Sequence, residues 1–162
     1  MRPARKTDAR RKARLTVKIE RSLKQGRIPR KLMVAAVEQV GQGEKLSGSI
    51  RIIVVGDFFM RDLNRKFRMK DKPTDVLAFP LGKPFPSAGA SPLIGEVYCN
   101  YDHARRWHRE HGGTIAAELS RLAVHGALHL AGYDHHRPGE RKQMTAAENR
   151  YLCDAGLLEM RT

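Results

Sequence analysis

The sequence HGALHLAGYDHH, residues 125 to 136, is the stretch from which the rest of this chain is best interpreted. His125 and His129 leave the same face of a helix, because residues four apart lie one turn above each other. From Leu122 to Ala131 the other side chains are apolar nearly all round, which predicts a helix buried in the core. Buried imidazoles need polar partners, so this stretch predicts a functional site as well as a core element.

A third histidine follows the predicted end of this helix. Gly132 most easily takes the left-handed conformation that terminates a helix, and the turn after it can bring His135 back toward His125 and His129. Three neutral imidazoles bind one Zn²⁺ and leave a fourth tetrahedral position open, as in catalytic zinc sites. We therefore expect one zinc ion per chain, bound by these three histidines. The alternative third ligand is His136, and spacing favours His135.

Two other interpretations apply to the same histidines. A pair of histidines four residues apart is, taken alone, more often structural or surface chemistry than a metal site. The spacing H-x3-H-x2-G-x2-H is also that of the long metalloprotease signature, but Gly126 stands where that signature has its general base, a glutamate. A closed structural zinc site would need a fourth ligand, and the isolated Cys99 and Cys153 offer no obvious one.

Two stretches of the chain resemble one known family. HGALHLAGYDH matches every fixed letter of the YbeY family signature, HGxLHLxGYDH. FRMKDKPTDVLAFP, residues 67 to 80, is similar to the other marked block of that family, in which Arg68 matches a fixed arginine. The resemblance covers roughly residues 46 to 155 and does not reach the first fourteen. It implies a single α+β domain, a three-histidine zinc site and endoribonuclease activity in ribosomal RNA maturation.

The resemblance adds two candidate catalytic residues, Arg68 and Glu96. A guanidinium can bind a phosphate through two parallel hydrogen bonds and can neutralise charge that develops during cleavage. Glu96 follows Gly95 where the family usually carries aspartate, and a carboxylate there can orient water or a metal-bound imidazole. A salt bridge or an exposed strand position is the alternative for Glu96.

The charge of the chain indicates a polyanionic partner. The net charge is +14, from 31 Lys and Arg against 17 Asp and Glu, and the sequence pI is about 10.4. The family resemblance implies that this partner is RNA rather than DNA, specifically ribosomal RNA or the small ribosomal subunit. Basic residues on two predicted helices and a turn are available to bind phosphates, although many of them are ordinary solvated positions: Arg65, Lys70, Lys72, Arg105, Arg106 and Arg109.

Two parts of the chain differ in composition. Residues 1 to 14 carry seven basic residues and one acidic residue without apolar periodicity, which predicts a disordered basic arm, either RNA-binding or only solvated. Residues 15 to 162 are expected to form a single catalytic domain. The sequence has no run long enough to span a membrane and no secretory signal, and its two cysteines are isolated, so we expect a soluble, cytoplasmic protein without a membrane partner.

The periodicities predict an α+β fold. Four short stretches favour strands: residues 15–20, 50–55, 75–80 and 93–100. About five helices accompany them without regular β-α-β alternation, which predicts a small mixed sheet packed by helices, with the histidine helix innermost. The segment 81–92, rich in Gly, Pro, Ser and Ala, is expected to be a mobile loop.

Local signals predict several helix boundaries. Pro29 suits the start of one helix, Thr114 is expected to cap the histidine helix, and Pro138 is expected to open the last helix. Asp57 is expected to cap another helix, with Phe58, Phe59, Leu63 and Phe67 facing inward.

The function that these features predict together is zinc-dependent hydrolysis of RNA phosphodiester bonds, preferentially in single strands. The family resemblance implies maturation of the 16S rRNA 3′ end and ribosome quality control. Either zinc-bound water or the 2′-hydroxyl of the RNA can serve as nucleophile. The main alternative is a non-catalytic ribosome or RNA-binding factor stabilised by zinc. A zinc protease is disfavoured by Gly126 and by the net charge of +14.

Overall fold

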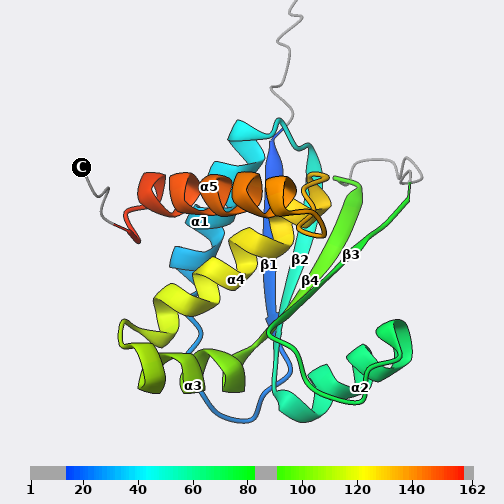
Figure 1. Ribbon diagram of the computed structural model, residues 1–162. Helices are drawn as coiled ribbons and strands as arrows, with labels where there is room; N and C mark the ends of the chain where they lie inside the picture. The colour runs from blue at the N-terminus through cyan, green and yellow to red at the C-terminus, as the bar shows by residue number, and fades with distance from the viewer. Residues whose placement is uncertain (1–13, 83–90, 159–162) are drawn as a thin grey trace, which may run out of the picture.

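The structure is a computed structural model that describes residues 14–82 and 91–158 (Figure 1). The predicted basic arm up to residue 13, and residues 83–90 of the predicted loop, lie outside the described residues. Along the chain the elements are β1 (Leu15–Arg21), α1 (Arg30–Gly43), β2 (Gly48–Val55), α2 (Asp57–Arg68), β3 (Val76–Pro80), β4 (Leu93–Asn100), α3 (Tyr101–His111), α4 (Ile115–Leu130) and α5 (Pro138–Asp154).

The four strands form one mixed sheet in the order β1-β2-β4-β3. β2 is parallel to both β1 and β4, whereas β3 is antiparallel to β4 and forms an edge. The apolar run in β2 lies in the middle of the sheet, where both faces of a strand are covered. The predicted α+β class, with a small mixed sheet and about five helices, is confirmed in the described part of the chain.

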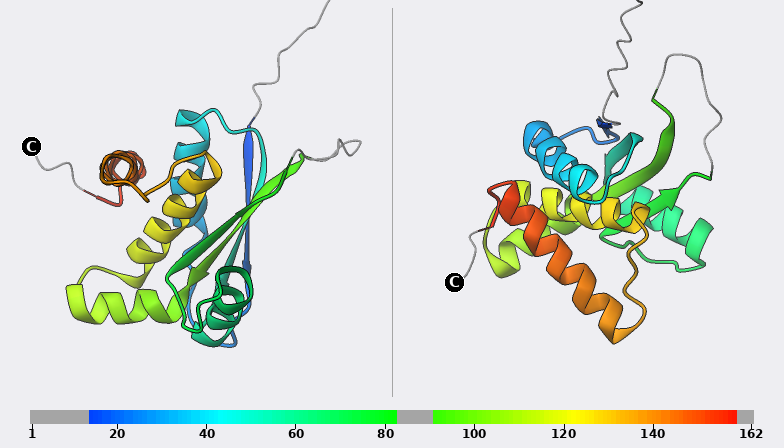
Figure 2. Two further views of the ribbon diagram at one scale, coloured as in Figure 1. Left: turned by 45° about the vertical axis from the view of Figure 1, so that its right-hand side comes forward. Right: turned by 90° about the horizontal axis from the view of Figure 1, so that it is seen from above.

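The two faces of the sheet are covered unequally (Figure 2). Helices α1, α3, α4 and α5 lie on one face, and α2 lies on the other. Because side chains alternate along a strand, Ile52 and Val54 of β2 join the large core beneath α1 and α4. Ile53 and Val55 join a smaller cluster with Met60 of α2. The side chain of any strand residue therefore points either to the sheet face covered by α4 or to the face covered by α2.

Helix α4 is the buried central helix that the sequence predicts. It packs against α1, α3, α5, β3 and β4, and Thr114 caps it by accepting a hydrogen bond from the backbone N–H of Ala117 at 3.0 Å. Gly126 faces β4 so closely that a Cβ there would lie 2.2 Å from Cγ1 of Val97. The helix therefore needs glycine at this position, and the glutamate of a metalloprotease would not fit.

The start of α2 differs from the prediction, in which Asp57 is the cap. The N-cap residue is Gly56, and Asp57 is the first helical residue. Its backbone N–H donates to the carboxylate of Asp102 at 2.9 Å, so a side chain from α3 caps this helix. The Asp57 carboxylate instead accepts hydrogen bonds from Asn100 and Arg106. A cap supplied from a distant segment leaves no signal in the local sequence.

The predicted inward face of α2 is wrong for its three phenylalanines, whereas Leu63 packs against the small core as predicted. Phe58, Phe59 and Phe67 are 89%, 40% and 60% exposed, and the buried residues of the helix are Met60 and Asn64. Asn64 donates a hydrogen bond from its amide to the backbone carbonyl of Lys72 at 2.7 Å, which ties the helix to the turn that follows. The contact surface on this sheet face is small, so it buries a narrow strip of α2 and leaves the aromatic rings at the surface.

Candidate metal centre

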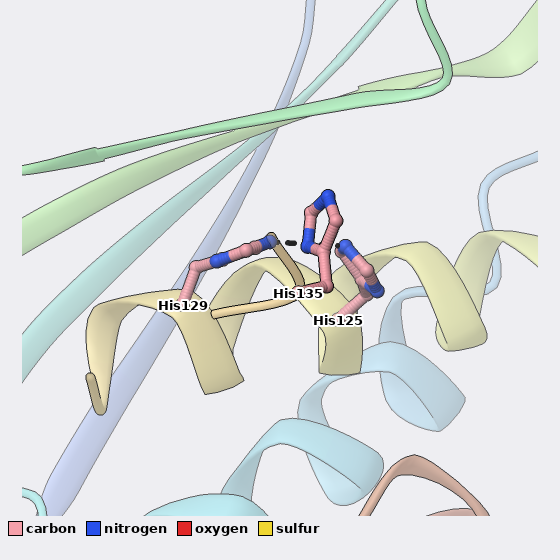
Figure 3. A group of neighbouring side chains, drawn as sticks. All are labelled: His125, His129 and His135. Atoms are coloured by element: carbon pink, nitrogen blue, oxygen red, sulfur yellow. Dashed lines mark hydrogen bonds between the residues drawn. The ribbon is translucent and has the colours of Figure 1, made fainter. Parts of the chain in front are cut away.

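The three histidines of the opening motif converge at the C-terminal end of α4 (Figure 3). One nitrogen from each of His125, His129 and His135 lies within 4.8 Å of the others. The chain reverses at Gly132, whose φ of +100° few other residues adopt, and the N–H of Tyr133 donates to the carbonyl of Leu128 at 3.0 Å. This local turn brings His135 back over the helix that carries the other two.

Hydrogen bonds on the far side of two rings determine which nitrogens face one another. Nδ1 of His129 lies 2.9 Å from the carbonyl oxygen of Tyr133, which can only accept, so this nitrogen carries the proton. Nδ1 of His125 faces the Glu148 carboxylate in the same manner. When both rings are neutral, their Nε2 atoms, 3.1 Å apart, present lone pairs to the same point. Two lone pairs cannot hydrogen-bond to each other, and a shared cation satisfies both.

Burial favours the neutral, metal-binding form of two of these imidazoles, those of His129 and His135. Desolvation, followed by the proximity of His125, lowers the pKa of His129 to about 4. Desolvation also lowers the pKa of His135. Nδ1 of His135 is buried without a hydrogen-bond partner among the described residues, which is unusual for a polar atom. Three converging imidazoles, one with an unsatisfied nitrogen, fit a zinc ion.

The arrangement distinguishes the two candidates for the third position. The side chain of His136 is 81% exposed and lies 3.3 Å from Asp134. Its ring centroid is 5.7 Å from that of His135, but its nitrogens are not among the grouped ones. The three grouped histidines are themselves half-buried rather than fully buried. A partly open site allows a substrate to reach it, which a fully enclosed metal would not.

The sequence interpretation missed Glu148 of α5. This buried carboxylate accepts the hydrogen bond from His125, and its second oxygen lies 3.6 Å from Arg121. Arg121 in turn forms two hydrogen bonds with the buried Glu118, at 2.9 and 2.7 Å. A carboxylate behind a metal-binding imidazole fixes the tautomer and orientation of the ring. The available signal was the position of Glu148 on the inward stripe of α5, one turn after the buried Met144.

Replacement of Glu148 by alanine is expected to weaken zinc binding about 10- to 100-fold, the usual cost of removing such a partner. Glu148→Gln keeps an acceptor for the Nδ1 proton and is expected to lose less affinity. Competition with a chromophoric chelator measures both values. Asp154→Ala, which removes an exposed carboxylate from the same helix, is the matched control and should bind zinc as the wild type does. Equal affinity of Glu148→Ala and wild type would contradict a supporting role for this carboxylate.

The structure does not bring Glu96 to the histidines. Its neighbours Gly95 and Val97 face α4, where a Cβ on Gly95 would lie 2.5 Å from Leu130, so Glu96 projects from the other face of the sheet. There it accepts hydrogen bonds from Arg51 at 2.6 Å and from the hydroxyl of Tyr98 at 3.0 Å. The salt-bridge alternative for Glu96 therefore agrees with the observed contacts, and a catalytic role has no contact to support it.

Arg68 and the predicted RNA-binding residues divide into two groups. Arg68 is exposed at the last residue of α2, on the sheet face opposite α4, so it does not lie among the histidines. Arg106 pairs with Asp57 and holds the pKa of that carboxyl below its usual range, which makes it a structural contact between α3 and α2. Arg65 and Arg105 pair with acidic residues three positions earlier. The side chains of Lys70, Lys72 and Arg109 make no hydrogen bond or ion pair within residues 14–82 and 91–158.

Fold and site together define a single-sheet α+β protein in which the central helix and the turn after it form a three-histidine site suited to a metal. The family model described as Endoribonuclease YbeY matches residues 15–156, and the chain belongs to this family of enzymes. In the described part of the chain, no helix combines the length and the apolar character needed to cross a bilayer.

Individual relatives agree with this assignment. Endoribonuclease YbeY of Anaeromyxobacter sp. (strain Fw109-5) is 38% identical over 145 residues, which cover 89% of this chain and 74% of that protein. The protein of the same name from Myxococcus xanthus is 43% identical over 116 residues, or 70% of this chain and 39% of that longer protein. The solution structure of TM1509 from Thermotoga maritima matches with a TM-score of 0.59 and 29% identity over 86% of this chain and 89% of that chain.

Proposed function

We propose that this protein is a zinc-dependent endoribonuclease that hydrolyses phosphodiester bonds of single-stranded RNA. The observation that carries the proposal is the convergence of His125, His129 and His135, with one buried nitrogen that has no other partner among the described residues. Relatives named Endoribonuclease YbeY support the reaction class, and the net charge of +14 supports a polyanionic substrate.

The residues around the histidines prepare the site for this chemistry. Zinc in such a site supplies Lewis acidity, which polarises a phosphoryl oxygen and activates water. Glu148 and the carbonyl of Tyr133 hold the protons of His125 and His129 on Nδ1, so that both Nε2 atoms remain available as ligands. The hydroxyl of Tyr133 also donates to Glu44 at 3.1 Å, which anchors the turn between His129 and His135 to α1. The chain thus fixes the orientation of its imidazoles before a substrate arrives.

The proposal extends to a biological role. We propose that the protein acts in the cytoplasm on ribosomal RNA or the small ribosomal subunit, in maturation of the 16S rRNA 3′ end and in ribosome quality control. The support is the match of both family motifs, together with a charge that suits ribosomal RNA. Residues 15–162 would form the catalytic domain, and residues 1–14 would add a basic arm.

The decisive experiment is cleavage of a labelled single-stranded RNA by purified protein with its metal present, chelated and restored. We expect close to one zinc per chain, internal cleavage that stops on chelation and returns with zinc, and slower cleavage of a duplex of the same sequence. RNA that is bound but remains intact under all three conditions would favour the non-catalytic RNA-binding alternative. The protease alternative has no place for its general base, because Gly126 packs against Val97.

A further inference from the structure

We propose that a second surface, on the sheet face opposite the histidines, binds single-stranded RNA by stacking its bases on aromatic rings. This surface consists of four rings, which we call the aromatic row, and the cations beside them. The row comprises Phe59 and Phe67 of α2, Phe79 of β3 and Tyr98 of β4. The inference rests on the proposed function in that RNA is taken as the substrate.

The aromatic row is continuous, with Phe59 and Phe67 exposed and Phe79 and Tyr98 half-buried. The rings of Phe59 and Tyr98 stack with centroids 6.1 Å apart, Tyr98 meets Phe79 edge-on at 5.7 Å, and Phe79 meets Phe67 edge-on at 5.0 Å. α2 lies on this side of the sheet (Figure 1). Both of its rings in the row are exposed and are not part of the small core. Exposed rings fixed by one another are suited to stack on unpaired bases.

The charges around the row favour a polyanion. Four basic residues lie within the seven positions from 66 to 72: Lys66, Arg68, Lys70 and Lys72. Their side chains make no hydrogen bond or ion pair with any described residue. The acidic groups nearby are already neutralised. Asp71 binds Arg61 through two hydrogen bonds of 2.9 Å, Asp62 binds Arg65, and Glu96 binds Arg51. The surface therefore presents aromatic rings within a net positive field.

This combination selects one kind of partner. A-form duplex RNA keeps its bases stacked inside, so the rings could not reach them, whereas a single strand exposes both its bases and its phosphates. An apolar protein surface would leave four cations without partners. A second copy of this chain would bring one net charge of +14 against another, which opposes association.

The edge strand β3 connects this surface with the metal centre. Phe79 of β3 belongs to the aromatic row, whereas the preceding Ala78 packs into the core on the α4 side. Leu130, which follows His129, packs closely against Gly95 of β4. A Cβ on Gly95 would lie 2.5 Å from the Leu130 side chain and 3.0 Å from the carbonyl oxygen of Phe79. One strand thus separates the two sites, and RNA held on the row can pass round the β3 edge toward the histidines.

The test compares Phe67→Ala with Phe58→Ala in the full-length, metal-loaded protein. Both changes remove an exposed phenylalanine from α2, but Phe58 is outside the aromatic row. Anisotropy of a labelled uridine oligomer, with its integrity checked on a gel, measures affinity. We expect Phe67→Ala to weaken binding about five- to a hundredfold without changing the salt dependence, because it removes a stacking ring and no charge. Phe58→Ala should change affinity less than about twofold.

Further probes separate base stacking from purely electrostatic binding and from self-association. An abasic oligomer of the same length keeps the phosphates, so its weaker binding should be equal for wild type and Phe67→Ala. Wild-type affinity of Phe67→Ala for the uridine oligomer, with a native melting temperature, would overturn the inference. An equal loss of affinity of Phe67→Ala for the abasic oligomer would also overturn it. An unchanged RNA affinity of Phe67→Ala together with an altered sedimentation coefficient would overturn it as well, and would indicate that this face binds a second copy of the chain.

The same measurements distinguish this inference from the proposed function. If the protein binds the uridine oligomer through Phe67 but never cleaves RNA, the aromatic row is supported as a binding surface and the proposed endoribonuclease activity is contradicted. If the protein cleaves RNA and Phe67→Ala binds RNA as well as the wild type does, the proposed activity is supported and the aromatic row is contradicted as a binding surface.

Discussion

Replacement of His129 by alanine is expected to remove zinc from the protein and to reduce RNA cleavage to the uncatalysed background. The ring of His129 adjoins both partners, with centroids 4.8 Å from that of His125 and 4.9 Å from that of His135. Two imidazoles do not replace three, because the affinity of an open zinc site depends on the full ligand set. Elemental analysis of the purified variant and single-turnover cleavage of a single-stranded RNA measure the two losses.

The matched control is His136→Ala, which should retain both zinc and activity. His136 adjoins a proposed ligand in the sequence, but its side chain is 81% exposed, lies 3.3 Å from Asp134 and is not part of the histidine group. His125→Ala and His135→Ala should behave as His129→Ala does, and circular dichroism should show that each variant remains folded. If His136 proves necessary for zinc while His135 is dispensable, the proposed ligand set is wrong.

Arg68→Ala is expected to have the largest effect outside the histidines. If the guanidinium neutralises charge at the reacting phosphate, as we propose from the family motif, single-turnover cleavage should slow by about two to three orders of magnitude. Zinc content and folding should not change, since the side chain is exposed and makes no hydrogen bond or ion pair with the described residues. Arg68 lies on the α2 side of the sheet and not among the histidines, so an unchanged single-turnover rate in Arg68→Ala would contradict a role at the reacting phosphate.

Two companion variants separate catalysis from binding at this position. Arg68→Lys keeps the positive charge but removes the planar guanidinium. Its cleavage rate should therefore stay well below that of the wild type if a bidentate contact with the phosphate matters. Lys70→Ala removes one neighbouring charge and should weaken binding modestly, with a slightly smaller salt dependence. Equal single-turnover rates for wild type and both Arg68 variants at saturating protein would leave Arg68 as a binding residue only.

Features encoded within a few neighbouring residues were predictable. The spacing of His125 and His129 and the glycine turn at 132 predicted which imidazoles converge, and the structure groups the same three histidines. The strands, the Thr114 cap and the start of α5 at Pro138 also agree with local periodicity and capping preferences. In each case the interacting atoms are close in the chain, so short-range stereochemistry suffices to place them.

Features that depend on contacts between distant segments were not predictable. Glu148 reaches His125 only because α5 packs across α4, Asp102 caps α2 from another helix, and Glu96 meets Arg51 only through the pairing of β4 with β2. The exposed rings of α2 follow from the small area that the sheet offers to that helix. A local pattern shows that a side chain is apolar or charged, but its partner depends on how the elements pack, and packing is set by the shape and register of the whole core.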